Sequence, residues 1–148
     1  MESGAVRVVR IHWKRYESYE AAQECNGVVY LFEGKGRPYH WGKVGRSYFG
    51  GKTRRLDVWQ VSARYSTQYE HLIAAFLMQG GRLYIGKPAM PEGVTLDDVE
   101  TSLIVKYPPH ILARPPKPRL NLRVLNVGSK PACLPYAFVC SAQEPTFA

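Results

Sequence analysis

Hydrophobic and polar residues alternate over residues 6–13, which is the pattern of a strand with one buried face. One side of this strand carries Val8, Arg10 and His12. The other side carries Val9, Ile11 and Trp13. Ser18 then suits the N-cap of a short helix that ends near residue 24, because a serine hydroxyl accepts a hydrogen bond from an unpaired N–H group of the first turn. The chain is therefore expected to begin with a strand and a short helix.

Two apolar segments, Gly27-Val28-Val29-Tyr30 and His40-Trp41-Gly42-Lys43, each resemble a strand with polar side chains set into it. The turn-forming residues 33–38 between them predict a hairpin that folds the first strand back on the second. We expect this hairpin to bring together the phenol of Tyr30, the imidazole of His40 and the ammonium of Lys43. A phosphodiester is a ligand that would explain three such groups at one place.

Helical periodicity appears between the hairpin and the next predicted strand, and again after that strand. Residues 68–79 place apolar side chains at the spacing of a buried stripe, and Gly80 and Gly81 form a C-terminal stop. The pattern over residues 54–64 predicts a helix more weakly, and residues 82–86 are predicted to form a third strand. Thr95 caps another helix from Leu96, with Asp98 completing a capping box, and this helix ends before Pro108.

These elements predict an α+β domain, in which a small antiparallel sheet has helices on its faces. The strand near the N-terminus is an addition to this sheet. The C-terminal region is rich in proline, so residues 124–148 are expected to be an irregular extension, with short extended pieces over residues 120–122 and 136–139 docked on the domain. Residues 1–26 are expected to be an N-terminal extension packed on the domain, which leaves residues 27–123 as the main body.

Composition is that of a folded protein with one modest core, because the chain has 148 residues of which 45% are hydrophobic. No apolar run is long enough to span a bilayer, and no signal-peptide pattern is present at the N-terminus, so we expect a cytoplasmic protein. The three cysteines, Cys25, Cys133 and Cys140, match no zinc-binding spacing. They are interpreted as reduced thiols.

The net charge of +8 is unevenly distributed. Residues 35–64 contain eight lysines and arginines and a single acid, Asp57, and a second basic stretch extends from Arg114 to Lys130. A charged run is often only a solvated face, but here it directly follows the unusual strand pair. Clustered cations neutralise phosphates well, which indicates a nucleic acid as the partner.

Several side chains are candidates for chemistry on a phosphodiester. Glu100 borders the apolar stripe of its helix, so it is either paired with an arginine or a ligand of Mg²⁺, which commonly takes one or two protein carboxylates. Tyr30 is either a general base or an ordinary strand aromatic. Arg64 is a candidate phosphate clamp, and Arg55 competes for that role. The remaining candidates for substrate binding are Arg46, His71 and Asn121.

With these residues assembled, the chain resembles the GIY-YIG nuclease superfamily over residues 27–121. Tyr30 corresponds to the first motif, and His40 stands where the second motif usually has a tyrosine. Arg64 or Arg55, Glu100 and Asn121 follow in the order of the family pattern. The resemblance implies a three-stranded antiparallel sheet flanked by helices, with residues 27–123 as the catalytic domain.

The resemblance also implies metal-dependent hydrolysis of DNA. One Mg²⁺ or Mn²⁺ ion would bind Glu100, Tyr30 would act as the general base, and Arg64 and Lys43 would stabilise the phosphate. His40 would take part in proton transfer. The alternatives are a non-catalytic nucleic-acid-binding module and a basic structural protein that binds other anionic surfaces. The chain is expected to act alone, as a homodimer or as a subunit.

Overall fold

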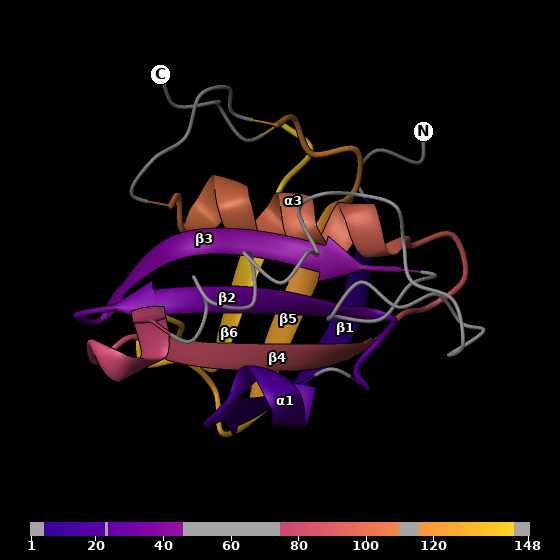
Figure 1. Cartoon of the computed structure of the whole chain (residues 1–148). Coiled ribbons are helices and arrows are strands. Elements are labelled where there is room, and N and C mark those ends of the chain that lie inside the picture. Colours follow the sequence, from indigo (N-terminus) through magenta and orange to yellow (C-terminus); the bar gives the residue numbers. More distant parts are fainter. Residues whose placement is uncertain (1–4, 23, 46–74, 110–115, 144–148) are drawn as a thin grey trace.

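A curled six-stranded sheet organises the described part of the chain (Figure 1). The computed structural model describes residues 5–22, 24–45, 75–109 and 116–143. The strands in chain order are β1 (Val6–Tyr16), β2 (Val28–Gly34), β3 (Arg37–Val44), β4 (Arg82–Ala89), β5 (Asn121–Gly128) and β6 (Ala137–Cys140). Their order across the sheet is β3-β2-β4-β1-β5-β6. The β1–β5 pair is parallel and the other pairs are antiparallel, so the sheet is mixed.

The sheet curls around helix α3 (Leu96–Lys106). The helix contacts β2 and β3 at one end of the sheet and β6 at the other. At its C-terminal end, the indole of Trp41 from β3 donates to the carbonyl of Tyr107 at 2.8 Å, and the Tyr107 ring packs edge-on against Phe138 of β6. The two edge strands therefore meet the same helix end, which closes one side of the structure.

The concave face of the sheet holds the larger core, which we call the inner cluster. Val29, Leu31 and Trp41 pack there with Val99 and Leu103 of α3. The opposite face holds a smaller outer cluster, formed by Val28, Tyr30, Phe32, Val44, Leu83, Ile85 and Ala22. Ala22 comes from the short helix α1 (Tyr19–Ala22), so α1 packs on the outer face.

The β2–β3 hairpin confirms the predicted strand pair. Lys35 and Gly36 form its two-residue turn with φ angles of 54° and 75°. Two central residues with positive φ define a type I′ turn, whose twist matches that of the flanking strands. Glycine adopts this conformation freely, whereas a lysine with positive φ is strained.

The helix-start signals are also confirmed. The Thr95 hydroxyl accepts a hydrogen bond from the Asp98 N–H group, and the Asp98 carboxylate accepts one from the Thr95 N–H group, which is the predicted capping box. The Ser18 hydroxyl accepts from the Ala21 N–H group at the start of α1. Residues 75–78 are helical and Gly80 has a φ of 92°, as expected for a glycine stop. The rest of the predicted helix over 68–79 and the helix over 54–64 lie outside the described residues.

The predicted fold class is wrong: the sheet is neither three-stranded nor entirely antiparallel, and the described residues are mostly β. The N-terminal strand is no addition, since β1 lies between β4 and β5 near the middle of the sheet. The region interpreted as irregular contributes β5 and β6. Its prolines flank these strands and do not interrupt them, so a high proline content did not exclude regular structure.

The residue ranges predicted as separate parts share this one sheet. β1 comes from the range 1–26, and β5 crosses the boundary between residues 123 and 124. The helices described here are all too short or too polar to cross a membrane.

Candidate functional site

Tyr30 of β2 and His40 of β3 lie together on the outer face, with ring centroids 6.0 Å apart. Tyr30 is 5% exposed, and its ring packs edge-on against Phe32 at 5.7 Å. It also covers Gly42 on the neighbouring strand, in the space that a side chain there would fill. Tyr30 is therefore a core residue whose position is fixed by packing.

Lys43 and Glu100 form a second group with Asp97. The Lys43 Nζ atom lies 3.6 Å from Asp97 Oδ1 and 3.7 Å from Glu100 Oε1. Asp97 and Glu100 lie one turn apart on α3, so both carboxylates reach the same ammonium. Burial raises the pKa of the Glu100 carboxyl above its usual value, and the charge of Lys43 offsets only part of that rise.

These two groups occupy opposite faces of the sheet. Val29 and Leu31 pack beneath α3, so Tyr30 between them points the other way. Lys43 is paired with Val29 across the hairpin and lies on the α3 side. The structure thus brings Tyr30 to His40 and Lys43 to Glu100, but it does not bring the two pairs together.

The other predicted site residues are not part of either group in the described structure. Asn121 lies on β5, which β1 and β4 separate from β2, and its Oδ1 atom accepts a hydrogen bond from the Ala142 N–H group at 2.6 Å. The remaining four candidates lie outside the described residues: Arg46, Arg55, Arg64 and His71.

Glu100 and Asp97 are the carboxylates available for the predicted metal ion. The Lys43 ammonium forms an ion pair with each of them, so its single positive charge is shared between two carboxylates. Within the residues that the structure describes, no three His, Cys, Asp or Glu side chains gather into a metal-binding group. A divalent ion bound to Glu100 alone, as predicted, would have to displace the Lys43 ammonium from this carboxylate.

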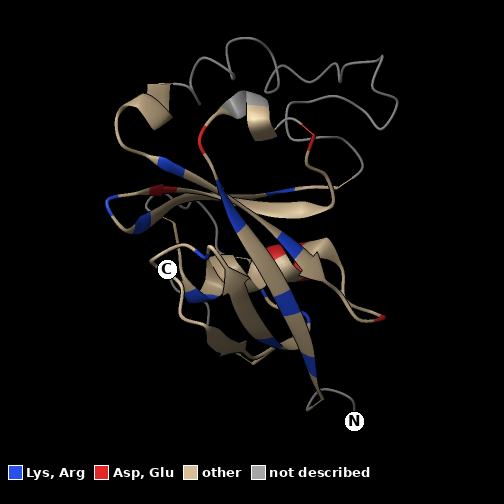
Figure 2. Cartoon of the chain, turned by 90° about the horizontal axis from the view of Figure 1, so that it is seen from below, with Lys and Arg blue, Asp and Glu red and all other residues tan. Residues whose placement is uncertain are grey.

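A different feature is formed by lysine, arginine and histidine side chains on the outer face of β1, β4 and β5. We call this surface the basic face and define it by Arg10, His12, Lys14, Lys87 and Arg123. All five residues are exposed. They share a face because they alternate with the inner-cluster residues of their own strands. Blue bands recur along β1, the long strand that begins near the N-terminal trace in Figure 2.

The described strands contain almost no acidic residues that could offset the positive charge of the basic face. Glu33 is the single acidic residue in the six described strands, and it is 2% exposed. Across the β1–β4 pair, His12 lies directly opposite Lys87. A cavity of about 320 Å³ at this point is lined by His12, Lys14 and Lys87 together with Glu24 and Asn26. The Lys87 Nζ atom donates to the Asn26 carbonyl at 3.2 Å, which holds one cation at the cavity.

Apolar side chains extend the basic face towards β6. Val6 and Val8 of β1 are each 51% exposed, and Val139 of β6 is 52% exposed. Val8 and Val139 flank Arg123 in the sheet register, and Val6 lies two positions from Val8 on the same face of β1, so the valines border the cations.

The sequence contained part of this signal. The alternation over residues 6–13 put Val8, Arg10 and His12 on one side of a strand. It did not show that Lys87 and Arg123 would join them, because the neighbours of β1 come from distant parts of the chain.

Comparison with known proteins gave no relatives: no family model, curated protein or solved structure matches this chain.

Proposed function

We propose that this protein binds nucleic acid through the basic face. The observation that carries the proposal is the row of exposed cations on one side of β1, β4 and β5, in a sheet whose strands hold one acid, which is buried. Phosphate groups neutralise such cations and release counterions, which drives binding. Lys87 supports this with Arg10 and Lys14 of the neighbouring strand, because the three exposed cations lie on one face of the β1–β4 pair.

The valines beside the cations favour a nucleic acid over a smaller anion. A polynucleotide offers sugar and base surfaces as well as phosphates, and Val6, Val8 and Val139 provide an apolar area for those surfaces. An open sheet face is a known platform for single strands in RNA- and DNA-binding domains. A single polynucleotide ligand therefore accounts for both the basic residues and the exposed apolar residues.

Binding without hydrolysis fits the geometry better than the nuclease mechanism does. In that mechanism Tyr30 and Glu100 would act on the same phosphate, yet they lie on opposite faces of the sheet. The resemblance to GIY-YIG nucleases supports a nucleic-acid ligand but implies a different sheet from the one observed. DNA remains the partner that we propose, with RNA as an alternative ligand in the test.

The binding test measures the fluorescence anisotropy of labelled 20-nucleotide DNA and RNA, single-stranded and duplex, at several salt concentrations. For a single strand, each lost phosphate contact lowers the slope of log K against log salt by about 0.7. We expect the Arg10→Ala/Arg123→Ala variant to lose about 1.4 from the slope. The matched control is Arg15→Ala/Lys117→Ala, which removes the same charge outside the basic face and should keep the wild-type slope.

Equal slopes for the two double variants would contradict the basic face as the binding surface. Absence of salt-dependent binding by the wild-type protein to any of the four ligands would contradict the function itself.

Hydrolysis is tested with plasmid DNA in the presence of Mg²⁺ or Mn²⁺, using the wild-type protein, Glu100→Ala and Tyr30→Phe. We expect the plasmid to stay intact with all three proteins while the wild-type protein binds it. Nicking that Glu100→Ala abolishes would overturn binding without hydrolysis and restore the nuclease mechanism.

A further inference from the structure

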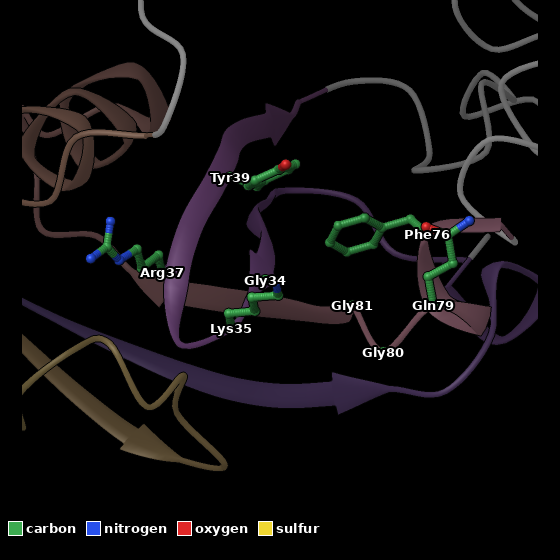
Figure 3. A pocket seen from close by; sticks show the side chains of 8 residues that line it. All are labelled: Gly34, Lys35, Arg37, Tyr39, Phe76, Gln79, Gly80 and Gly81. Atoms are coloured by element: carbon green, nitrogen blue, oxygen red, sulfur yellow. The ribbon is translucent and has the colours of Figure 1, made fainter.

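A second cavity lies at the turn of the β2–β3 hairpin, on the outer side of the sheet (Figure 3). Its volume is about 580 Å³, which is within the usual range for a small-ligand site. The walls include Lys35, Arg37 and Tyr39 from the hairpin and Phe76 and Gln79 from the segment that leads into β4. None of the described residues that line it is acidic.

One part of the cavity wall is aromatic and another part is cationic. The Tyr39 side chain is 51% exposed, and its ring centroid lies 6.0 Å from that of Phe76 at an interplanar angle of 33°. The two rings are too close for a third ring to enter between them, so a planar ligand has to contact the exposed part of Tyr39. Lys35 and Arg37 are exposed at the hairpin end and provide positive charge. Figure 3 shows Lys35 and Arg37 on the hairpin and Phe76 and Gln79 across from it.

The cavity walls are held by packing and turn geometry. Phe76 packs edge-on against Phe32 with centroids 5.5 Å apart, which joins it to the outer cluster. Lys35 is held by the type I′ turn in a positive-φ conformation that a lysine adopts at an energetic cost. Fixed walls reduce the ordering cost of binding a ligand.

We propose that this cavity binds one unpaired nucleotide, whose base stacks on Tyr39 beside Phe76 and whose phosphate lies at Lys35 and Arg37. An aromatic ring next to two cations matches a base joined to a phosphate, and Gln79 offers both a donor and an acceptor to the base edge. The base must be unpaired, because in a duplex both of its faces are covered by neighbouring bases. This inference rests on the proposed function where the nucleotide belongs to a bound strand, while a free nucleotide has the same chemistry.

The test compares oligothymidylate with an abasic strand of the same length, and adds AMP as the free nucleotide. The variant is Tyr39→Leu, which keeps an apolar side chain but removes the ring. We expect it to bind oligothymidylate at least about fivefold more weakly than the wild-type protein, as expected for one lost stacking contact. Its binding to the abasic strand should be unchanged, which also shows that the variant is folded.

The matched control is Tyr136→Leu, which removes a tyrosine that is 75% exposed and outside the cavity. It should bind all ligands as the wild-type protein does. Lys35→Ala/Arg37→Ala should weaken binding of both strands, since both carry phosphates. A 2-aminopurine base in the strand should lose fluorescence on binding to the wild-type protein, because stacking quenches it, and should keep more of it with Tyr39→Leu.

The outcomes separate this inference from the proposed function. Equal affinity of Tyr39→Leu and the wild-type protein for oligothymidylate, while Arg10→Ala/Arg123→Ala still weakens binding, would overturn the nucleotide cavity alone. If no strand binds, the proposed function fails, and AMP titration followed by NMR shifts at Gln79 then decides the cavity. AMP that shifts Gln79 in the wild-type protein and not in Tyr39→Leu supports a free nucleotide as the ligand, and no shift overturns the inference.

Discussion

The ring of Tyr30 lies against the backbone of Gly42 on the neighbouring strand, in the position that a Cβ atom would occupy. Glycine is therefore required at residue 42 by a close approach and not by its backbone conformation. The contact also holds Tyr30 within the outer cluster, where its ring packs against Phe32.

The first prediction is that Gly42→Ala lowers the free energy of unfolding by about 1–3 kcal/mol, the usual cost of overpacking a filled core. Chemical denaturation measures this change. Gly45→Ala is the control, because no described residue lies within 4 Å of the Cβ that it would add. It should leave stability unchanged or raise it slightly by restricting the unfolded chain. Similar losses in the two variants would argue against the Tyr30 contact as the cause.

The carboxyl group of Asp98 predicts how the stability of the protein depends on pH. It is 8% exposed, and burial opposes its ionisation, but hydrogen bonds from Arg119 and Thr95 outweigh burial and hold the pKa of this carboxyl below its usual value. A lowered pKa in the folded state contributes stability above the unfolded pKa of about 3.9, and the contribution is lost as the pH falls through the folded value.

We expect Asp98→Asn to lower the free energy of unfolding at pH 7 by about 1–2 kcal/mol, because a cap and charged hydrogen bonds are lost. The stability of the variant should also fall less steeply below pH 4 than that of the wild-type protein. Urea denaturation between pH 2.5 and pH 7 measures both effects. Asp97→Asn is a control in the same helical turn, with a side chain that is 71% exposed, and it should change stability little.

The contribution of Glu100 to stability should change with pH in the opposite direction to that of Asp98. Its pKa is raised, mainly by burial, so its ionisation costs stability as the pH rises from the unfolded pKa of about 4.3 through the folded value. Glu100→Gln removes that ionisation and should raise the free energy of unfolding at pH 7 above that of the wild-type protein. Denaturation at pH 4 and pH 7 distinguishes this from Asp98→Asn. A loss of stability at pH 7 would mean that the Lys43 pair outweighs the burial of Glu100.

Lys35 links stability to ligand binding. Asparagine adopts positive φ more readily than lysine, so Lys35→Asn should raise the free energy of unfolding by about 0.5–1 kcal/mol. The same substitution removes a cation from the nucleotide cavity and should weaken binding of oligothymidylate. Thermal denaturation and anisotropy on one preparation test both effects. If stability does not rise, the positive φ of Lys35 carries no measurable strain.

Local signals in the sequence predicted local structure well. The Lys35-Gly36 turn, the Thr95 cap with Asp98 and the Gly80 stop each depend on a few neighbouring residues, and each is confirmed. The sequence also implied that the predicted site residues would not converge. His40 and Lys43 are three positions apart, and a strand places such residues on opposite faces. The hairpin was correct, but the expectation that its polar groups converge was not.

The sheet itself depends on information that no local pattern contains. Leu122, Val124 and Asn126 alternate with more exposed residues, which is an ordinary strand pattern, but nearby prolines led to an irregular interpretation. Even a correct strand assignment would not have shown that β5 pairs in parallel with β1. The basic face depends on this pairing, since Arg123 joins Arg10 and Lys14 only when the two ends of the chain meet.

The position of β1 has a consequence for how the chain folds. Its two partners are β4, which begins at residue 82, and β5, which begins at residue 121. During synthesis, this strand of 11 residues therefore has both edges unpaired until most of the polypeptide has left the ribosome. Unpaired strand edges favour association with other chains, and distant pairings fold slowly. The lysine and arginine side chains of β1 would then act early as well, because their charge repulsion keeps nascent chains apart before the sheet is complete.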